Sequence, residues 1–225
     1  MKKFIFSALA IISLGCAAFG GTPTYSKESN SVATTSCPQW YADHEFNVSL
    51  WGTYASSFSE WRDDTYLLAD HAWGGGTDLK YFFNRYLGVG VQGYVIFPKS
   101  KETFNDGVSV FQASEDHRTV GSVLGTFTVR VPISCSRFAP YAWVGGGGIF
   151  GGGSGRETLF LVDPPFTQVE HRFPESKSEL VGQVGAGFEV RITPHVGILN
   201  DFSWNIVSGS GNNFGMARTG LNIAF

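Results

Sequence analysis

The chain has 225 residues, of which 29 are glycines, 15% are aromatic and only 16% are charged. A formal net charge of -3 provides no basic surface of the kind that binds nucleic acid. The sequence also lacks a Walker-type phosphate loop, a His-Glu-x-x-His motif and a paired Cys-x-x-Cys motif. It therefore has no motif for nucleotide binding, for a zinc protease or for a cysteine-based metal or redox site.

The first 20 residues are typical of a secretory signal peptide. Lys2 and Lys3 precede an apolar run over residues 4–14, and small residues follow that run. The run is too short to cross a bilayer as a helix, which takes about 20 apolar residues. We expect cleavage after Gly20, which makes residues 1–20 a signal peptide, 21–44 an N-terminal periplasmic segment and 45–225 a barrel domain.

A lipoprotein signal is the alternative, because "LGC" ends at Cys16. Ser13 stands where a lipoprotein signal has leucine, so lipidation of Cys16 stays an alternative and not the preferred interpretation. In both interpretations the chain is exported from the cytoplasm.

Eight segments after the signal alternate apolar and polar residues. Each is close to the 9 to 11 residues that a tilted transmembrane strand requires. The segments are residues 45–54, 73–83, 87–97, 119–131, 139–150, 178–192, 195–207 and 213–225. In the first, Phe46, Val48 and Leu50 alternate with Glu45, Asn47 and Ser49. No helical periodicity of comparable length occurs, so we predict an all-β chain.

The connections between these segments alternate in length. Residues 55–72, 98–118 and 151–177 are long connections, whereas "NRY", "PISCSRF" and "TPH" are short and residues 208–213 are intermediate. Outer-membrane barrels have short periplasmic turns and longer extracellular loops. We therefore predict an eight-stranded antiparallel transmembrane β-barrel with this arrangement.

Charged and amide side chains occupy one face of the predicted strands. An eight-stranded barrel encloses just enough space for side chains, so opposite charges on this face are expected to pair and plug the lumen. The candidates for these ion pairs are Asp78, Lys80, Arg130, Glu189, Arg191, Asp201 and Arg218. The opposite face is apolar and is expected to contact lipid.

Four tryptophans lie near the ends of predicted strands. Trp51, Trp73, Trp143 and Trp204 suit the aromatic belts at the membrane interfaces, although Trp51 falls on the inward face by strict alternation.

The last strand carries the most specific signal. Leu221, Ile223 and Phe225 alternate up to a terminal aromatic residue, and "FFNRYLGVGV" forms the second predicted hairpin. With the eight-strand layout, residues 45–225 resemble the OmpA-like porin-family barrel. The resemblance implies a monomer in the outer membrane, with membrane lipid and the barrel assembly machinery as partners. Larger OmpA relatives add a peptidoglycan-binding domain, and we do not carry that function over to this chain.

No catalytic, cofactor or metal site is predicted. His44, His71, His117, His171 and His195 are scattered over ends and loops without metal-ligand spacing. His117, beside Glu115 and Asp116, is the one candidate for an enzyme of the outer rim, and we interpret it as a solvated loop residue. The stretch "GGGGIFGGGSG" lacks the Gly-Lys-Ser/Thr end of a phosphate loop and is expected to lead a curved strand into a mobile loop.

Two cysteines remain after signal cleavage. Cys37 precedes the first strand and Cys135 lies in the turn after the fourth, so the topology places both at the periplasmic end. The periplasm is oxidising. A Cys37–Cys135 disulfide and two separate thiols both remain open, because the two residues need not lie on the same side of the barrel.

The sequence favours a non-catalytic outer-membrane barrel with a structural, surface-interaction or weak porin role. One alternative is an outer-membrane enzyme that acts on lipid, and a second is a soluble periplasmic ligand-binding barrel. The surface partner, if there is one, is not identified by the mixed composition of the loops.

Deletion of Phe225 should reduce the amount of folded protein in the outer membrane, because the terminal recognition feature is lost. Heat-modifiable gel mobility measures this amount. Unchanged insertion of the truncated chain would contradict the interpretation.

Overall fold

Nine β-strands make up the part of the chain that the structure, a computed structural model, describes. The described residues are 37–57, 66–67, 69–105, 110–160, 168–209 and 212–225, all within the unit Cys37–Phe225. The strands are β1 (Glu45–Ser56), β2 (His71–Asn84), β3 (Leu87–Asn105), β4 (Val110–His117), β5 (Val120–Arg130), β6 (Phe138–Phe160), β7 (Gln168–Thr193), β8 (Val196–Val207) and β9 (Phe214–Ala224). The predicted signal peptide and Cys16 lie outside the described residues.

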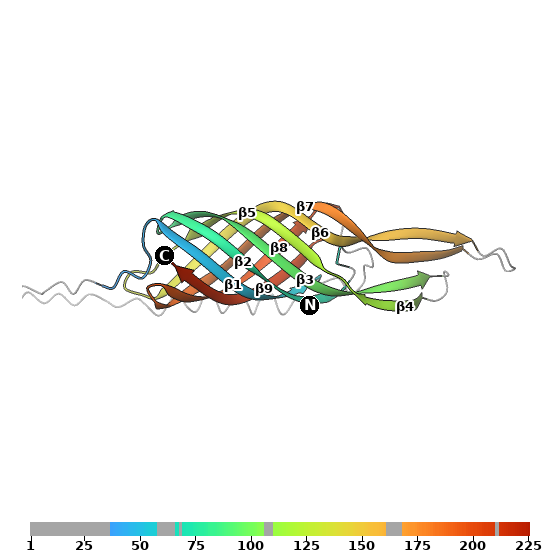
Figure 1. The fold of residues 1–225 in the computed structure, drawn as a ribbon, viewed down its shortest axis with the longest axis horizontal. Coiled ribbons are helices and arrows are strands. Elements are labelled where there is room, and N and C mark those ends of the chain that lie inside the picture. The colour runs from blue at the N-terminus through green and yellow to red at the C-terminus, as the bar shows by residue number, and fades with distance from the viewer. Residues whose placement is uncertain (1–36, 58–65, 68, 106–109, 161–167, 210–211) are drawn as a thin grey trace, which may run out of the picture. The chain divides into compact units, whose positions relative to one another are not determined.

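Eight of the nine strands close into an antiparallel barrel (Figure 1). Each strand of the ring pairs with the next one along the chain, except that β3 pairs with β5 and β4 lies outside the ring. The ring closes where β1 pairs with β9, from Asn47 opposite Ala224 to Ser56 opposite Gly215. The eight predicted strands are therefore confirmed. The described residues contain no helix that is long and apolar enough to cross a membrane.

Strict alternation along the strands separates an apolar exterior from a polar lumen. On β1, Asn47 and Ser49 are buried, whereas Phe46 before them and Leu50 after them are 41% and 72% exposed. The same pattern continues around the ring, for example at Leu180 and Leu221. Large apolar side chains on the outside and amides and charges inside are the reverse of a water-soluble barrel.

The short connections meet at one end of the barrel, which we call the turn end. Asn84 shapes the β2–β3 turn, because its Oδ1 accepts the backbone N–H groups of Tyr86 and Leu87 at 2.9 and 2.8 Å. Thr193 Oγ1 accepts the N–H of Val196 at 3.0 Å in the β7–β8 turn. The C-terminus lies at this end, where Phe225 exchanges two backbone hydrogen bonds with Phe46.

The opposite end of the barrel is called the hairpin end. The prediction of long loops at this end was wrong in part, because residues 98–118 and 151–177 consist largely of paired strands. Strand β3 continues to Asn105 and pairs with β4, and β6 continues to Phe160 and pairs with β7, so both connections extend as hairpins beyond the ring (Figure 1). The segment that was expected to enter a mobile loop is part of β6, with register shifts and positive φ angles at Gly151 and Gly153. The apolar alternation that revealed the other strands is required only where one face meets lipid.

Two of the four tryptophans assigned to interfacial belts lie inside the barrel. Trp51 and Trp143 are 3% and 2% exposed, whereas Trp73 is 67% exposed. Glycines make room for the inner rings: a Cβ on Gly76 would come within 2.6 Å of Trp51 Cη2, and one on Gly185 within 2.6 Å of Trp143 Nε1. Large and small inward residues thus complement one another across neighbouring strands.

Gly185→Ala should lower the free energy of unfolding by about 1–3 kcal/mol, because the added methyl group overlaps the indole of Trp143. Gly146→Ala on the outer face is the matched control, because its Cβ would meet nothing within 4 Å, and it should change stability by less than about 0.5 kcal/mol. Urea titration of the folded protein in lipid vesicles measures both. Equal stability of the two variants would show that the inner glycines are not required by packing.

Candidate functional site

The centre of the lumen is organised around Arg218. Its guanidinium donates two hydrogen bonds to Asp201, from Nε to Oδ1 at 2.6 Å and from Nη2 to Oδ2 at 2.8 Å. The pairing of β8 with β9 puts these residues directly opposite one another. This paired geometry suits the planar guanidinium and is among the stronger charge-assisted contacts.

Two indole rings lie close to the same guanidinium. Arg218 Cζ lies 4.7 Å from the ring centre of Trp51 and 4.5 Å from that of Trp143. Arg218 Nη1 also donates to Gln92 Oε1 at 2.8 Å. Aromatic rings and polar acceptors around the guanidinium match the cation-π and hydrogen-bonding preferences of arginine.

Lys80 and Asp78 complete this mid-lumen cluster. Lys80 Nζ lies 2.9 Å from Asp78 Oδ2, and that oxygen is 4.0 Å from Arg218 Nη1. The hydroxyl of Tyr141 donates to Asp201 Oδ2 at 2.6 Å. Gln92 donates in turn to Gln183, and Gln183 to Ser203, both at 2.9 Å. A continuous polar network therefore crosses the lumen.

A second cluster, nearer the turn end, is centred on Glu45. Its Oε1 accepts hydrogen bonds from Arg130 Nη1 at 2.9 Å and from Arg191 Nη2 at 2.6 Å. Glu189 lies 2.5 Å from Arg191 Nε and 3.5 Å from Arg130 Nη1. These four side chains, the turn-end cluster, alternate in charge around the lumen.

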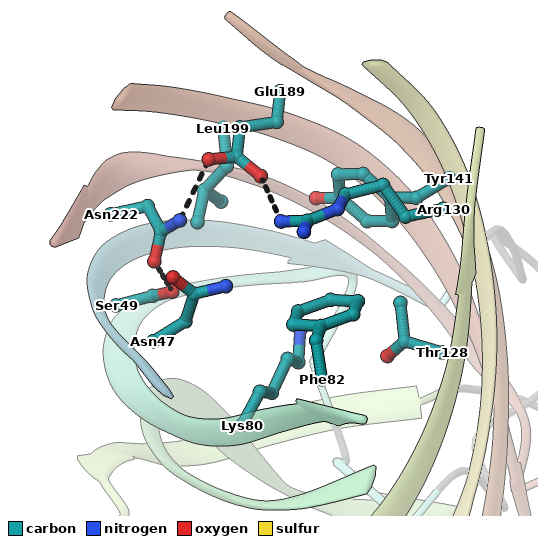
Figure 2. Close-up of a pocket in the computed structure, with 10 residues that line it drawn as sticks. All are labelled: Asn47, Ser49, Lys80, Phe82, Thr128, Arg130, Tyr141, Glu189, Leu199 and Asn222. Atoms are coloured by element: carbon teal, nitrogen blue, oxygen red, sulfur yellow. Dashed lines mark hydrogen bonds and ion pairs between the residues drawn. The ribbon is translucent and has the colours of Figure 1, made fainter. Parts of the chain in front are cut away.

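A small cavity separates the two clusters (Figure 2). Figure 2 shows Glu189 bridging Arg130 and Asn222, with Ser49 bonded to Asn222 and with Lys80 and Phe82 on the opposite wall. The cavity volume is about 20 Å³. Since a water molecule needs a comparable volume, this space accommodates water and excludes a hydrated solute.

The charges in the lumen balance. Among the described residues, the buried acidic side chains are Glu45, Asp78, Glu189 and Asp201, and the buried basic ones are Lys80, Arg130, Arg191 and Arg218. Four negative and four positive groups leave no net charge to attract an ion of either sign. Toward the hairpin end the lumen becomes apolar, with buried Ile96, Val120, Ile149, Val207 and Phe214.

The turn end of the lumen is covered by the segment Cys37–His44, which we call the strap. Tyr41 on the strap is 3% exposed, and its ring centre lies 4.7 Å from Arg130 Cζ and 5.0 Å from Arg191 Cζ. Its hydroxyl is within hydrogen-bond distance of two carbonyl oxygens, Arg137 O at 2.7 Å and Glu189 O at 3.1 Å. Burial raises the pKa of the Tyr41 phenol, aided by the Glu189 carboxylate, so the hydroxyl remains a donor at neutral pH.

A disulfide fixes the start of the strap. Cys37 and Cys135 are bonded with a Cα–Cα distance of 5.1 Å, so of the two possibilities left open by the sequence the structure contains the bond. At the other end of the strap, Asp43 Oδ1 accepts the backbone N–H of Arg85 at 2.8 Å, and this bond lowers the pKa of the Asp43 carboxyl.

All seven residues predicted as lumen ion-pair candidates have buried side chains and lie within the two clusters. Sequence reasoning missed Glu45 as the acceptor shared by Arg130 and Arg191, although alternation had put it on the polar face. It also missed Tyr41, which precedes the first strand and has no periodicity to reveal it. The terminal residues Leu221, Ile223 and Phe225 are exposed on the outer surface.

The histidines do not converge on a site in the described part of the chain. His44 contacts the hydroxyl of Tyr81, His71 stacks on Tyr54, and His195 contacts the carbonyl of Ala224. The backbone of His117 pairs with Lys99 in the β3–β4 hairpin, so this residue lies in a strand and not in the expected loop. Groups of three or more potential metal ligands are likewise absent from the described residues.

In sequence, the chain matches no family model and no curated protein. In structure, Neisserial surface protein A superposes with a TM-score of 0.50 and 14% identity, over 80% of this chain and 96% of that one. The chain has the fold of an eight-stranded outer-membrane β-barrel. Ail, the attachment invasion locus protein of Yersinia pestis, gives a TM-score of 0.48 at 14% identity over 81% of this chain and 99% of that one. The N-terminal barrel domain of Pseudomonas aeruginosa OprF gives 0.46 at 11% identity, over 82% and 99%.

The likeness to Neisserial surface protein A is a likeness of fold alone, because only 14% of the residues are identical. It agrees with the OmpA-like barrel architecture expected from the terminal strand and the second hairpin.

Arg218→Ala should lower the free energy of unfolding by about 3–5 kcal/mol, because Asp201 is left buried without its counterion. Arg85→Ala is the matched control: its ion pair with Asp43 is 3.6 Å long and exposed on both sides, so its loss should cost at most about 1 kcal/mol. Urea unfolding in vesicles compares the two. A loss no greater for Arg218→Ala than for Arg85→Ala would rule out an essential buried ion pair.

Proposed function

We propose that the chain is a non-catalytic barrel of the outer membrane, closed to bulk solute, that holds a β-sheet platform at the cell surface. The observation that carries the proposal is a lumen filled with side chains of balanced charge, inside a barrel whose outer surface is apolar.

The exterior supports a membrane location. Around the ring, outward positions carry exposed large apolar side chains, among them Val91, Val123, Val144, Phe202 and Ile206. In water such a surface would be a large contiguous apolar patch of the kind that drives association. In lipid it is the favourable surface of a transmembrane barrel, with outer-membrane lipid as its solvent.

The side chains that fill the lumen support a barrel that is closed to solute. An eight-stranded ring leaves little interior space beyond its side chains, and here that space holds two hydrogen-bonded charge clusters and an apolar layer. Tyr41 adds a cover at the turn end. A weak porin role would require these groups to move apart.

The hairpin end supports a surface role. Beyond the ring, Thr103–Asn105 of β3 pair with Glu170–Arg172 of β7, which joins the β3–β4 and β6–β7 hairpins into one sheet. In the topology of outer-membrane barrels, the end opposite the short turns faces outward. A paired sheet at that end is suited to contact with another molecule, and the turn end then faces the periplasm.

The alternatives are less well supported. An enzyme that acts on lipid needs a nucleophile or base held at the rim, and the described histidine side chains are instead engaged in separate structural contacts. A soluble ligand-binding barrel needs an apolar lumen and a polar exterior, which is the reverse of the observed pattern.

Planar-bilayer recording tests the closed lumen. The wild-type protein should pass little current, and Arg218→Ala should raise single-channel conductance because it removes a side chain at the centre of the network. Arg85→Ala, whose side chain lies at the exposed turn end, should leave the current unchanged.

A large and steady wild-type conductance would show an open pore and overturn the proposal. Equal currents for all three proteins, each small, would retain the closed barrel but remove Arg218 from the groups that close it.

A further inference from the structure

The disulfide at the start of the strap is open to solvent. Cys37 and Cys135 are both exposed. A surface hollow of about 300 Å³ is lined by the two cysteines together with Trp40, Tyr86 and Ile133. A thiolate carried by another protein therefore has access to the bond, beside the exposed side chains of Tyr86 and Ile133.

The same bond is the covalent anchor of the strap. Between Cys37 and the first strand, the strap is held only by noncovalent contacts. Tyr41 is the main one, with its hydroxyl 2.7 Å from Arg137 O and its ring against Arg130 and Arg191. Ala42 N–H also donates to Glu45 Oε2 at 3.2 Å, and Trp40 stacks with Arg137 at 4.5 Å. The Asp43 contacts with Arg85 are exposed. Without the disulfide, the strap is tied covalently only where it enters β1.

Tyr41 lies midway between these two attachments and covers the turn-end cluster. Behind that cluster is the cavity, with Lys80 on its wall. Displacement of Tyr41 would expose Arg130 and Arg191 to water and would leave the turn-end cluster as the one layer between the turn end and Lys80. Without the ring packed on them, these two side chains are freer to move, and Lys80 becomes more accessible from the turn end.

We propose that Cys37–Cys135 is a thiol–disulfide exchange site and that its oxidation state controls closure of the turn end by Tyr41. The partner is a protein dithiol of the periplasm, so the inference rests on the proposed orientation of the barrel with its turn end in that compartment.

The exchange is balanced in atoms and electrons. A thiolate of the dithiol attacks one sulfur of the bond and forms a mixed disulfide, and the other cysteine sulfur leaves as a thiolate and takes up a proton. The second thiol of the partner then displaces the remaining cysteine as a thiol. The Cys37–Cys135 pair gains two electrons and two protons, and the partner becomes a disulfide.

Acetylation of Lys80 tests closure directly. Lys80 is the buried lysine of the lumen among the described residues, whereas Lys177 is 44% exposed and serves as an internal reference. The mature protein in detergent micelles, in which the reagent reaches both ends of the barrel, is treated with sulfosuccinimidyl acetate in two states: oxidised, and reduced with a phosphine and then capped with iodoacetamide. Mass spectrometry gives the ratio of Lys80 to Lys177 acetylation in each.

Reduction should raise this ratio about tenfold, because the strap then loses its covalent anchor and Tyr41 is held only by contacts that are each worth about 0.5–1.5 kcal/mol. Tyr41→Ala should raise the ratio in the oxidised state as well, because the cover is absent while the bond is intact. Ile192→Ala, on the outer face of β7 near the turn end and 50% exposed, is the control and should behave as wild type.

Equal ratios in the oxidised and reduced wild type would overturn the proposal, whatever the result for Tyr41→Ala. A rise that accompanies loss of the folded gel mobility would also overturn it, because the barrel itself would then have opened. These failures differ from failure of the proposed function, which appears as a large current through the oxidised wild-type protein.

Discussion

Burial of the Arg218 guanidinium is the constraint on which the interior of the barrel depends. A cation enclosed by a barrel wall and surrounded by lipid is tolerated only when its charge is matched and its N–H groups are bonded. Asp201 provides the charge and two acceptor oxygens, and Gln92 provides another acceptor. The rest of the mid-lumen arrangement follows from accommodating this group.

The two indole rings illustrate that dependence. Trp51 and Trp143 lie against the guanidinium, and each ring needs a neighbour without a side chain, which Gly76 and Gly185 provide. Glycine therefore recurs on the inward face where a strand of larger residues would not fit. The turn-end cluster contains the same three kinds of group. The ring of Tyr41 lies over the guanidinium groups of Arg130 and Arg191, and the Glu45 carboxylate is paired with both. In both places an aromatic ring, a guanidinium and a carboxylate fill space that would otherwise hold water.

Much of this architecture is encoded locally in the sequence, because contact with lipid imposes a period of two on every transmembrane strand. That constraint predicted the eight strands of the ring and the seven candidate charges in the lumen. It ends where the strands leave the membrane, so "KSKETFN" and "VFQASEDH" gave no comparable signal, although they form the β3–β4 hairpin. Trp143 was wrongly predicted to lie at a membrane interface, because residue type alone does not distinguish a tryptophan at the interface from one inside the lumen. Which residues pair across the lumen depends on the register between distant strands, as between Glu45 and Arg191, and no local pattern carries that information.

The account is tested most directly by a double-mutant cycle between Arg218 and Asp201, with leucine at each position and unfolding followed in lipid vesicles. If the buried pair is the central element, the two single variants should each be strongly destabilised. The double variant should then be less destabilised than their sum, by about 1–3 kcal/mol. Additivity of the two losses to within about 0.5 kcal/mol would contradict the account, because it would show that the two groups do not depend on one another.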